Sequence, residues 1–461
     1  MRTARWLSLA IAGIMIIGAC GGGTGGSTTG GDTGVKAPDK GVEPASKIVF
    51  WHAMSGVNGD AVNKLVSDFN KSQSKITVEA IFQGNYDDAL AKLNTALASN
   101  SAPALIQVYD IGQRYMIDTG EIVPIQSFID RDKYDVSDFE PAVINYYKVE
   151  GKLYSMPFNS SSSILYYNKE AFREVGLDPE KPPKTFDEVL DYAKKLTKKD
   201  ASGQTVRYGF GPSVYGWLFE QWLAVSGGYF ADNGNGREKR ATKIAFNDEK
   251  GKAIFDFWKA GIDSGAFYNP GQDNDGAANA FNAGKTAMYV ESTARLRGHI
   301  NATQGKFTVG TGRYPRPANA PASAGSIIGG ASVYMMKSRP AAEQNAAWEF
   351  VKFWVDPKQQ AIWQAATGYY PVVKKAYDQP ESKEWATKYP VFLTAVDQIR
   401  QSPQNTATAG AVIGVFPEAR RRVQKAIEEL ILGKAGSKEA LDAAAAELTA
   451  AIEKYNKSTG K

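Results

Sequence analysis

Hydrophobic and polar positions follow two alternating patterns from residue 46 onward. Short β-rich runs stand at 47–52, 76–82 and 104–109, and none of them contains a Gly or Pro except at an edge. Between them, 62–69 and 86–97 carry apolar residues at helical spacing. Strands and helices that alternate at such short intervals are typical of βαβ units and a parallel sheet. The pattern therefore predicts the α/β class.

The later helices are marked by their ends. Thr185 and Glu188 have the spacing of a capping box, in which each side chain satisfies an unpaired backbone donor at the start of a helix. Pro417 opens a basic segment that we expect to be helical over 418–432 and to end at Gly433. The Ala-rich segment 437–455 predicts a final helix. Alternation over this length, without a catalytic cluster, predicts two α/β lobes.

The N-terminus reads as an export signal. Arg2 and Arg5 precede an apolar run over 6–19, which is shorter than the ~20 residues that a membrane-spanning helix needs. The end of this run, Ile-Gly-Ala-Cys at 17–20, resembles the bacterial lipobox, in which the Cys becomes the lipidated first residue. A lone Cys is otherwise usually a small buried hydrophobe. We expect a signal peptide over 1–19, lipidation of Cys20, and a Gly-rich flexible tether over 20–45.

Composition narrows the chemistry. The 461 residues carry a net charge of +5, which is too small and too dispersed for a nucleic-acid-binding protein. One Cys and two His exclude an intramolecular disulfide and a Cys/His zinc site. A Ser-His-Asp enzyme would have to use His52 or His299. We therefore expect no enzymatic activity, no metal and no cofactor.

A series of short motifs points to a family. They are Phe-Trp-His at 50–52, Gly-Asn-Tyr at 84–86, Gln-Val-Tyr-Asp at 107–110, Asn-Ser-Ser at 159–161, Tyr-Asn-Lys at 167–169, Gly-Gly-Ala-Ser at 329–332 and Gly-Tyr-Tyr-Pro at 368–371. In this order they resemble the glycerol-3-phosphate-binding proteins of bacterial ABC importers. That group is a branch of the extracellular sugar-binding superfamily that includes maltose-binding protein. The resemblance covers about 48–457.

The resemblance implies a two-lobed periplasmic-binding-protein fold, type II-like, with a hinge and a ligand cleft between the lobes. We expect the first lobe to contain 46–157 and about 293–338, and the second 158–292 and about 339–461. It also implies a monomer that delivers a small molecule to a membrane permease. With the N-terminal signals, this places the protein outside the cytoplasmic membrane, anchored as a lipoprotein.

The resemblance carries over ligand contacts one by one. They fall on Tyr86, Asp110, Ser161, Ser292, Gly330, Tyr369 and Arg420, with Trp217 as a further aromatic contact. Arg420 suits a phosphate because a guanidinium presents a rigid fork of donors. Asp110, which follows a predicted strand, can only accept hydrogen bonds and should face hydroxyls or a cationic headgroup. Read without the family, each residue also has an ordinary structural role, such as a helix cap or a turn.

One position departs from the family pattern. The family has two tryptophans three residues apart, and here Trp217 fills the second place while Val214 stands at the first, with Tyr215 beside it. A missing indole would open the pocket, which favours a larger glycerophosphodiester such as glycerophosphocholine over glycerol-3-phosphate. Two other readings remain: an oligosaccharide-binding protein of the same architecture, and a secreted glycoside hydrolase with two carboxylates.

Overall fold

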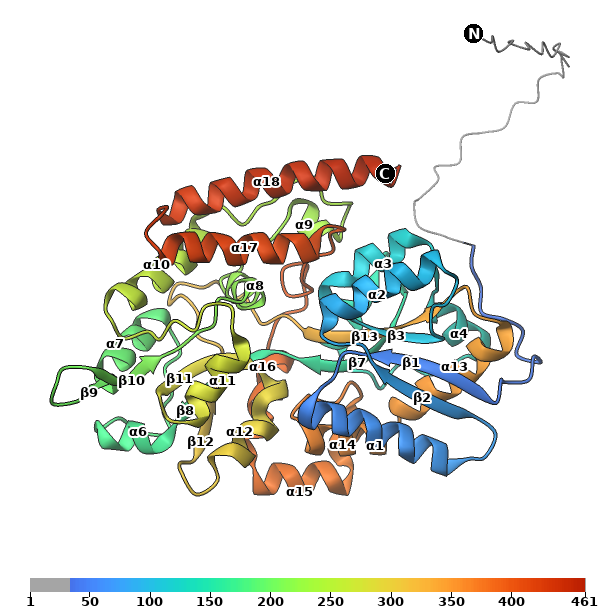
Figure 1. The fold of residues 1–461 in the computed structure, drawn as a ribbon, viewed down its shortest axis with the longest axis horizontal. Helices are drawn as coiled ribbons and strands as arrows, with labels where there is room; N and C mark the ends of the chain where they lie inside the picture. The colour runs from blue at the N-terminus through green and yellow to red at the C-terminus, as the bar shows by residue number, and fades with distance from the viewer. Residues whose placement is uncertain (1–33, 461) are drawn as a thin grey trace, which may run out of the picture. The chain divides into compact units, whose positions relative to one another are not determined.

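Two β-sheets organise the chain in the computed structural model, which describes residues 34–460. Figure 1 shows the sheets side by side, each with its own helices. The first sheet has the order β2-β1-β3-β13-β4, and β7 also pairs with β13. The second has the order β12-β8-β11-β10-β9, and β5 and β6 form a separate hairpin. Each sheet with its helices is called a lobe below, and this arrangement confirms the α/β class predicted from the sequence.

The strands have the following bounds. The first sheet contains β1 (Lys47–His52), β2 (Thr77–Phe82), β3 (Leu105–Tyr109), β4 (Ile122–Val123), β7 (Met156–Ser161) and β13 (Gly329–Met336). The second contains β8 (Ser163–Asn168), β9 (Lys198–Lys199), β10 (Thr205–Phe210), β11 (Thr286–Ser292) and β12 (Val309–Gly312), and the hairpin is β5 (Lys148–Val149) and β6 (Lys152–Leu153). β1 pairs in parallel with β2 and β3, whereas β13 is antiparallel to its neighbours.

The helices of the first half follow the predicted alternation. They are α1 (Gly56–Ser72), α2 (Tyr86–Ala98), α3 (Gln113–Thr119), α4 (Ile125–Asp132), α5 (Pro141–Tyr147), α6 (Lys169–Glu174), α7 (Phe186–Leu196), α8 (Gly216–Val225) and α9 (Asp232–Gly236). The 3-10 turn η1 (Asp110–Gly112) joins β3 to α3. The capping box is present at α7, where Thr185 and Glu188 accept from each other's backbone N–H. The predicted starts of α2 and α7 are therefore confirmed, whereas α1 begins six residues before the predicted segment 62–69.

The second half is mainly helical. It contains α10 (Glu249–Asp263), α11 (Asn274–Asn282), η2 (Thr293–Arg295), α12 (Leu296–Thr303), α13 (Ala341–Trp354), α14 (Pro357–Thr367), η3 (Lys374–Asp378), α15 (Pro380–Lys388), η4 (Pro390–Phe392), α16 (Leu393–Arg400), α17 (Phe416–Ile431) and α18 (Ser437–Ser458). α17 and α18 pack together beside α8 and α10, along the upper edge of Figure 1. Among the described residues, no helix combines the length and apolar composition needed to cross a membrane.

Two segments, β12 and α13, lie in a different lobe from the one to which the predicted boundaries assign them. The prediction put 293–338 in the first lobe, but β12 pairs with β8 in the second sheet. It put 339–461 in the second lobe, but α13 packs on β1 and β13 of the first sheet. The fully buried rings of Trp348 and Trp354 lie on that face of α13, where they contact Phe128 and Phe158. Burial of these large apolar surfaces decides which sheet the helix covers.

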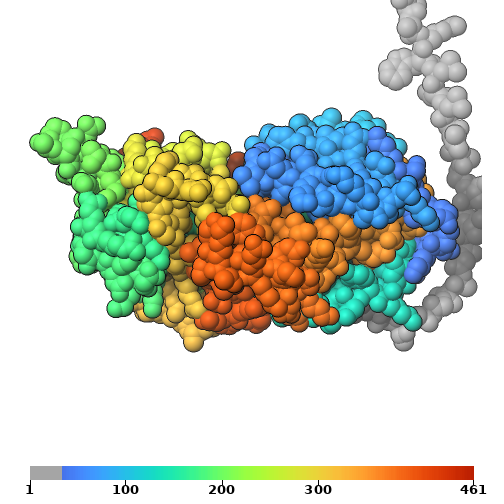
Figure 2. Space-filling view, turned by 90° about the horizontal axis from the view of Figure 1, so that it is seen from below, coloured from blue at the N-terminus to red at the C-terminus, as the bar shows by residue number. Residues whose placement is uncertain are grey.

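The chain connects the lobes at several points. It passes from the first sheet to the second at Ser162, the single residue between β7 and β8, and returns after β12 to begin β13. The lobes also meet through α14, which contacts α1 of the first lobe and α12 of the second. Figure 2 shows this from below, with the orange residues around 360–390 between the yellow residues of the second lobe and the blue residues of the first.

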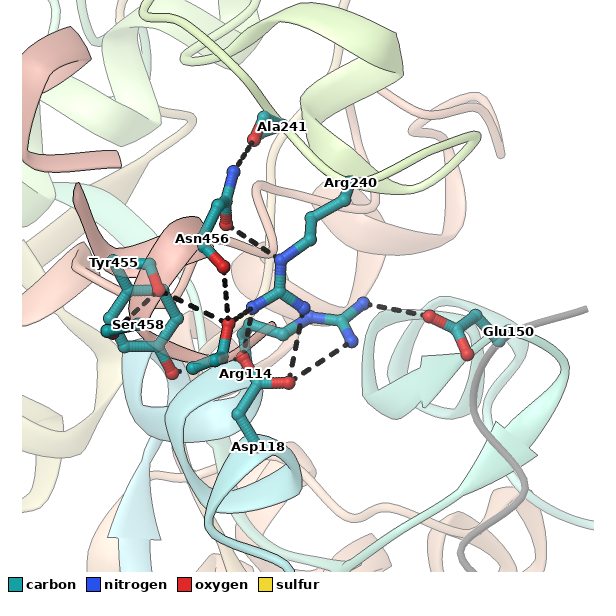
Figure 3. Close-up of polar contacts among 9 residues, drawn as sticks. Arg114, Asp118, Glu150, Arg240, Ala241, Tyr455, Asn456 and Ser458 are labelled. Atoms are coloured by element: carbon teal, nitrogen blue, oxygen red, sulfur yellow. Dashed lines mark hydrogen bonds and ion pairs between the residues drawn. The ribbon is translucent and has the colours of Figure 1, made fainter. Parts of the chain in front are cut away.

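A polar cluster joins the end of α18 to α3 (Figure 3). The Arg240 guanidinium binds Asp118 with both Nη groups, at 3.2 and 2.5 Å, and its Nε donates to Asn456 at 2.7 Å. The Tyr455 hydroxyl donates to the same aspartate at 3.0 Å. Arg114, from α3, pairs with Glu150 at 3.1 Å. We call this group the α3–α18 cluster; it links the first lobe to the C-terminal helix.

Candidate ligand-binding site

A cavity of about 320 Å³ lies where segments from both lobes meet. From the first lobe it is lined by the β1–α1 loop, the start of α2 and η1. From the second it is lined by the start of α8, the end of β11 with η2, and the start of α17. Asp110 directly follows β3 of the first lobe, and Glu291 is the last-but-one residue of β11 of the second. Ligands of α/β sheets bind at the carboxyl ends of the strands. The cavity therefore has the position expected of a ligand site.

The structure brings most of the predicted contact residues to this one cavity. Those lining it are Tyr86, Asp110, Ser161, Tyr215, Trp217, Ser292, Gly330, Tyr369 and Arg420. Val214 is the exception: its side chain is 1 % exposed and belongs to the hydrophobic core, and it is not among the lining residues. The space expected beside Trp217 through the loss of an indole therefore does not open at Val214, because the core fills that position.

Arg420 is the electrostatic centre of one end of the cavity. Its Nε donates to Glu220 Oε1 at 2.8 Å, and its Nη2 donates to Glu220 Oε2 at 2.7 Å and to Asp110 Oδ2 at 3.1 Å. All three side chains are buried, and Asp110 comes from the first lobe whereas the other two come from α17 and α8. Nη1 has no acceptor among the described residues, so this nitrogen is available to a ligand.

The charged forms of Arg420 and of the two carboxylates stabilise one another. Burial alone would lower the pKa of Arg420, but attraction to Asp110 and Glu220 raises it well above its usual value. Burial raises the pKa of Glu220 to about 7, and the contacts with Arg420 oppose that rise. The guanidinium therefore stays charged without solvent. This is the arrangement that a site needs if it is to hold an anion in a closed, water-poor cavity.

Asp110 lines the cavity and also binds a cation of the protein. We expected it to face ligand hydroxyls or a cationic headgroup, but its Oδ2 accepts from Arg420 and from the Tyr146 hydroxyl at 3.3 Å. The guanidinium of Arg420 therefore compensates much of the negative charge of Asp110. Asp110 therefore orients Arg420 across the cleft in this structure.

Aromatic side chains form the walls. Tyr86 stacks on Tyr109 with ring centroids 5.4 Å apart, and its hydroxyl accepts from Asn159 at 3.0 Å. Gly330 adopts φ +101°, and a Cβ there would lie 1.8 Å from the carbonyl oxygen of Asn159, so only glycine fits. The backbone can thus approach the cavity closely at this point.

A second group of charged residues in the cavity wall was not predicted. Glu291, the last-but-one residue of β11, lines the wall and is 4 % exposed. Arg295 lies on η2 and pairs with Asp275 at 2.5 Å. Glu291 follows the apolar strand residues 287–290, just as Asp110 follows 105–109. The criterion that singled out Asp110 would therefore have found Glu291 as well.

Glu220 was also missed, although its position carried a signal. It is the only charged residue in the apolar helix α8, Gly-Trp-Leu-Phe-Glu-Gln-Trp-Leu-Ala-Val. A charge in such a helix is buried and needs a partner. Among the described residues, no group of three or more His, Cys, Asp or Glu side chains is arranged to hold a metal ion.

Two α/β lobes that share a polar cavity define a two-lobed solute-binding protein. The family model described as "Bacterial extracellular solute-binding protein" matches residues 64–390. The chain belongs to this family and is therefore a binding protein rather than an enzyme. The family resemblance inferred from the motifs is confirmed.

Curated relatives match nearly the whole chain. The sn-glycerol-3-phosphate-binding periplasmic protein UgpB of Pectobacterium atrosepticum is 33% identical over 428 residues, which cover 91% of this chain and 94% of the relative. The protein of the same name from Escherichia coli is 32% identical over 424 residues, covering 90% and 95%.

Solved structures share the fold. UgpB from Mycobacterium tuberculosis, in complex with glycerophosphocholine, superposes with a TM-score of 0.76 at 21% identity and covers 89% of this chain and 99% of that one. The cyclic alpha-maltosyl-1,6-maltose binding protein from Arthrobacter globiformis gives a TM-score of 0.70 at 25% identity, covering 89% and 100%. The two-lobed binding-protein fold is thus confirmed.

Proposed function

We propose that this chain captures a glycerol phosphate ester, either glycerol-3-phosphate or a glycerophosphodiester such as glycerophosphocholine, and delivers it to the permease of an ABC importer. The observation that carries the proposal is the buried Arg420, which keeps Nη1 free at the wall of the cavity. A phosphate oxygen matches that donor in charge and geometry. The hydroxyls of Tyr86, Ser161 and Tyr369 line the same cavity and suit the glycerol oxygens.

The names of the relatives support this ligand class, since the two curated proteins are called glycerol-3-phosphate-binding. Isothermal titration calorimetry of the purified protein with glycerol-3-phosphate, glycerophosphocholine and maltose tests it. We expect measurable heat of binding with at least one phosphate ester and none with maltose. Binding of maltose alone would contradict the proposal.

An oligosaccharide is the second candidate ligand. Four carboxyl groups lie in or behind the cavity wall, together with Trp217 and several tyrosines, and sugar-binding clefts use the same side-chain types. The titration with maltose decides between the two, because a neutral sugar has no anionic group for Arg420 to bind.

We also propose that Cys20 carries a lipid anchor that holds the protein at the outer face of the cytoplasmic membrane. This residue, the signal peptide and residues 20–33 of the predicted tether lie outside the described residues. The flexible-tether prediction is wrong for the rest of that segment, because Arg131 and Asn345 donate hydrogen bonds to the backbone carbonyls of Pro38, Asp39 and Val42. Metabolic labelling with a fatty acid should tag the wild type and leave Cys20→Ser untagged and soluble. An untagged wild type would contradict the lipid anchor and indicate that the protein is secreted without one.

A further inference from the structure

Glu291 is a buried carboxylate at the cavity wall that forms no ion pair with another described residue. Its side chain is 4 % exposed, and its one hydrogen bond joins Oε1 to the backbone N–H of the next residue, Ser292, at 2.6 Å. Among the described residues, no Lys, Arg or His nitrogen lies within ion-pair distance of it. Glu291 and Arg295 attract each other, and this attraction is the largest single influence that raises the pKa of Arg295, although the ion pair of Arg295 is with the exposed Asp275. An unpaired buried charge is costly unless something compensates it.

The other carboxylates around the cavity differ in this respect. Asp110 and Glu220 bind Arg420, and Asp275 binds Arg295. Two arginines therefore face four carboxyl groups, and Glu291 is the one of the four without an ion pair among the described residues. Burial raises the pKa of Glu291, and attraction to Arg295 opposes that rise.

The overall charge of the cavity points to a particular ligand. A phosphate monoester would bring further negative charge to a site that already has more carboxylates than arginines. A zwitterionic diester brings one anionic phosphate and one cationic headgroup, so it adds no net charge. Its two charged groups need two recognition points within one small molecule's length.

Arg420, Tyr215 and Glu291 line the same cavity. The Arg420 guanidinium carbon lies 5.6 Å from the centroid of the Tyr215 ring. A ligand that fills the cavity of about 320 Å³ can reach both Arg420 and Glu291.

Building on the proposed function, we propose that Glu291 is a specificity-determining residue that pairs with the cationic headgroup of a zwitterionic glycerophosphodiester whose phosphate lies at Arg420. This moves the headgroup site away from Asp110, where the sequence had suggested it, because Arg420 already occupies that carboxylate. Selection of the diester then comes from charge pairing at Glu291 and not from a gap beside Val214.

A test on the ligand side needs no variant. Calorimetry of the wild type compares glycerophosphocholine with the analogue in which a carbon atom replaces the quaternary nitrogen, so that the headgroup is uncharged and the phosphate is kept. The two ligands have nearly the same shape, so a difference in affinity reports on charge. We expect the analogue to bind at least about tenfold more weakly. Equal affinity of the two ligands would overturn the proposal.

A test on the protein side uses Glu291→Gln, which removes the charge and keeps the shape. We expect glycerophosphocholine to lose at least about tenfold in affinity, while glycerol-3-phosphate binds as well as before or better. Glu249→Gln removes an exposed charge of the same lobe at the start of α10 and is the matched control, with both affinities unchanged.

The outcomes separate this proposal from the proposed function. A wild type that binds neither phosphate ester contradicts the proposed function itself. A wild type that binds glycerophosphocholine, with a Glu291→Gln variant that loses both ligands alike or neither, contradicts only the role of Glu291. An equal loss would mean that Glu291 merely positions Arg295. Retained binding of glycerol-3-phosphate also shows that the variant is folded.

Discussion

Two arginine–aspartate pairs each join the η1–α3 segment to a distant part of the chain. They differ in how many of the arginine's nitrogens the protein itself binds. Arg420 meets Asp110 at the cleft, and Arg240 meets Asp118 in the α3–α18 cluster (Figure 3). The two aspartates are eight residues apart, at η1 and on α3. Arg240 uses all three of its nitrogens on protein acceptors, including Thr459 at 3.2 Å, whereas Arg420 keeps Nη1 free.

The difference separates a binding group from a structural one. An arginine whose donors are all satisfied by the protein stabilises the packing of the segments that it joins. An arginine that is held by acids on one side and open on the other presents its remaining donor at no conformational cost, because its position is already set. The following predictions test whether this distinction is correct.

The largest effect is expected from Arg420→Ala. Ligand affinity should fall at least about 100-fold, because the main phosphate donor is lost. The free energy of unfolding should also fall by about 3–5 kcal/mol, because Glu220 and Asp110 stay buried without their cation. Calorimetry and chemical denaturation measure the two losses. Arg421→Ala is the matched control, since that neighbour is exposed and should change neither by much.

Asp118→Ala should mainly cost stability. The variant removes the acceptor shared by Arg240 and Tyr455, which we expect to lower the free energy of unfolding by about 2–3 kcal/mol. Ligand affinity should fall much less than in Arg420→Ala, since no group of the α3–α18 cluster lines the cavity. An affinity loss as large as that of Arg420→Ala would mean that this cluster controls closure of the cleft.

Acid should destabilise the protein through His52 and His299, which belong to neither arginine–aspartate pair. Burial lowers the pKa of His52 to about 4, and burial followed by Arg295 lowers that of His299 to about 3. Each imidazole is then neutral when folded but takes up a proton when unfolded below about pH 6.5. Stability is therefore lost as the pH falls from about 6.5 toward 4, by about 2 kcal/mol per histidine at pH 5. Denaturation curves of wild type and His299→Asn should differ in this slope; parallel curves would contradict it.

Val214→Trp should produce the smallest and least selective effect on binding. Because Val214 is buried in the core, a larger ring should cost about 1–3 kcal/mol of stability through overpacking. The affinities for glycerol-3-phosphate and glycerophosphocholine should shift alike. A selective loss of the larger ligand would show that this position does face the cavity.

Local patterns were enough to predict most of the elements. The strands at 47–52 and 104–109, the helix at 86–97 and the capping box at Thr185 lie where the sequence placed them, within a residue or so. Such features depend on residues that are near in the chain, and so they can be read from spacing. The alternation already predicted two α/β lobes, whereas the hinge, the interlobe cleft and the set of contact residues came from the family resemblance, which compares motifs along the whole chain.

By itself, then, the amino-acid sequence determined the α/β alternation, the helix ends and, through its motifs, the family. Only the tertiary structure decided the pairing of Arg420 with Asp110, 310 residues away, the burial of Val214, and the placement of β12 and α13. It also decided that Glu291 is buried without an ion pair to another described residue. The reason is physical: a residue's charge partner and its burial depend on which distant segments pack around it, and no local spacing encodes that.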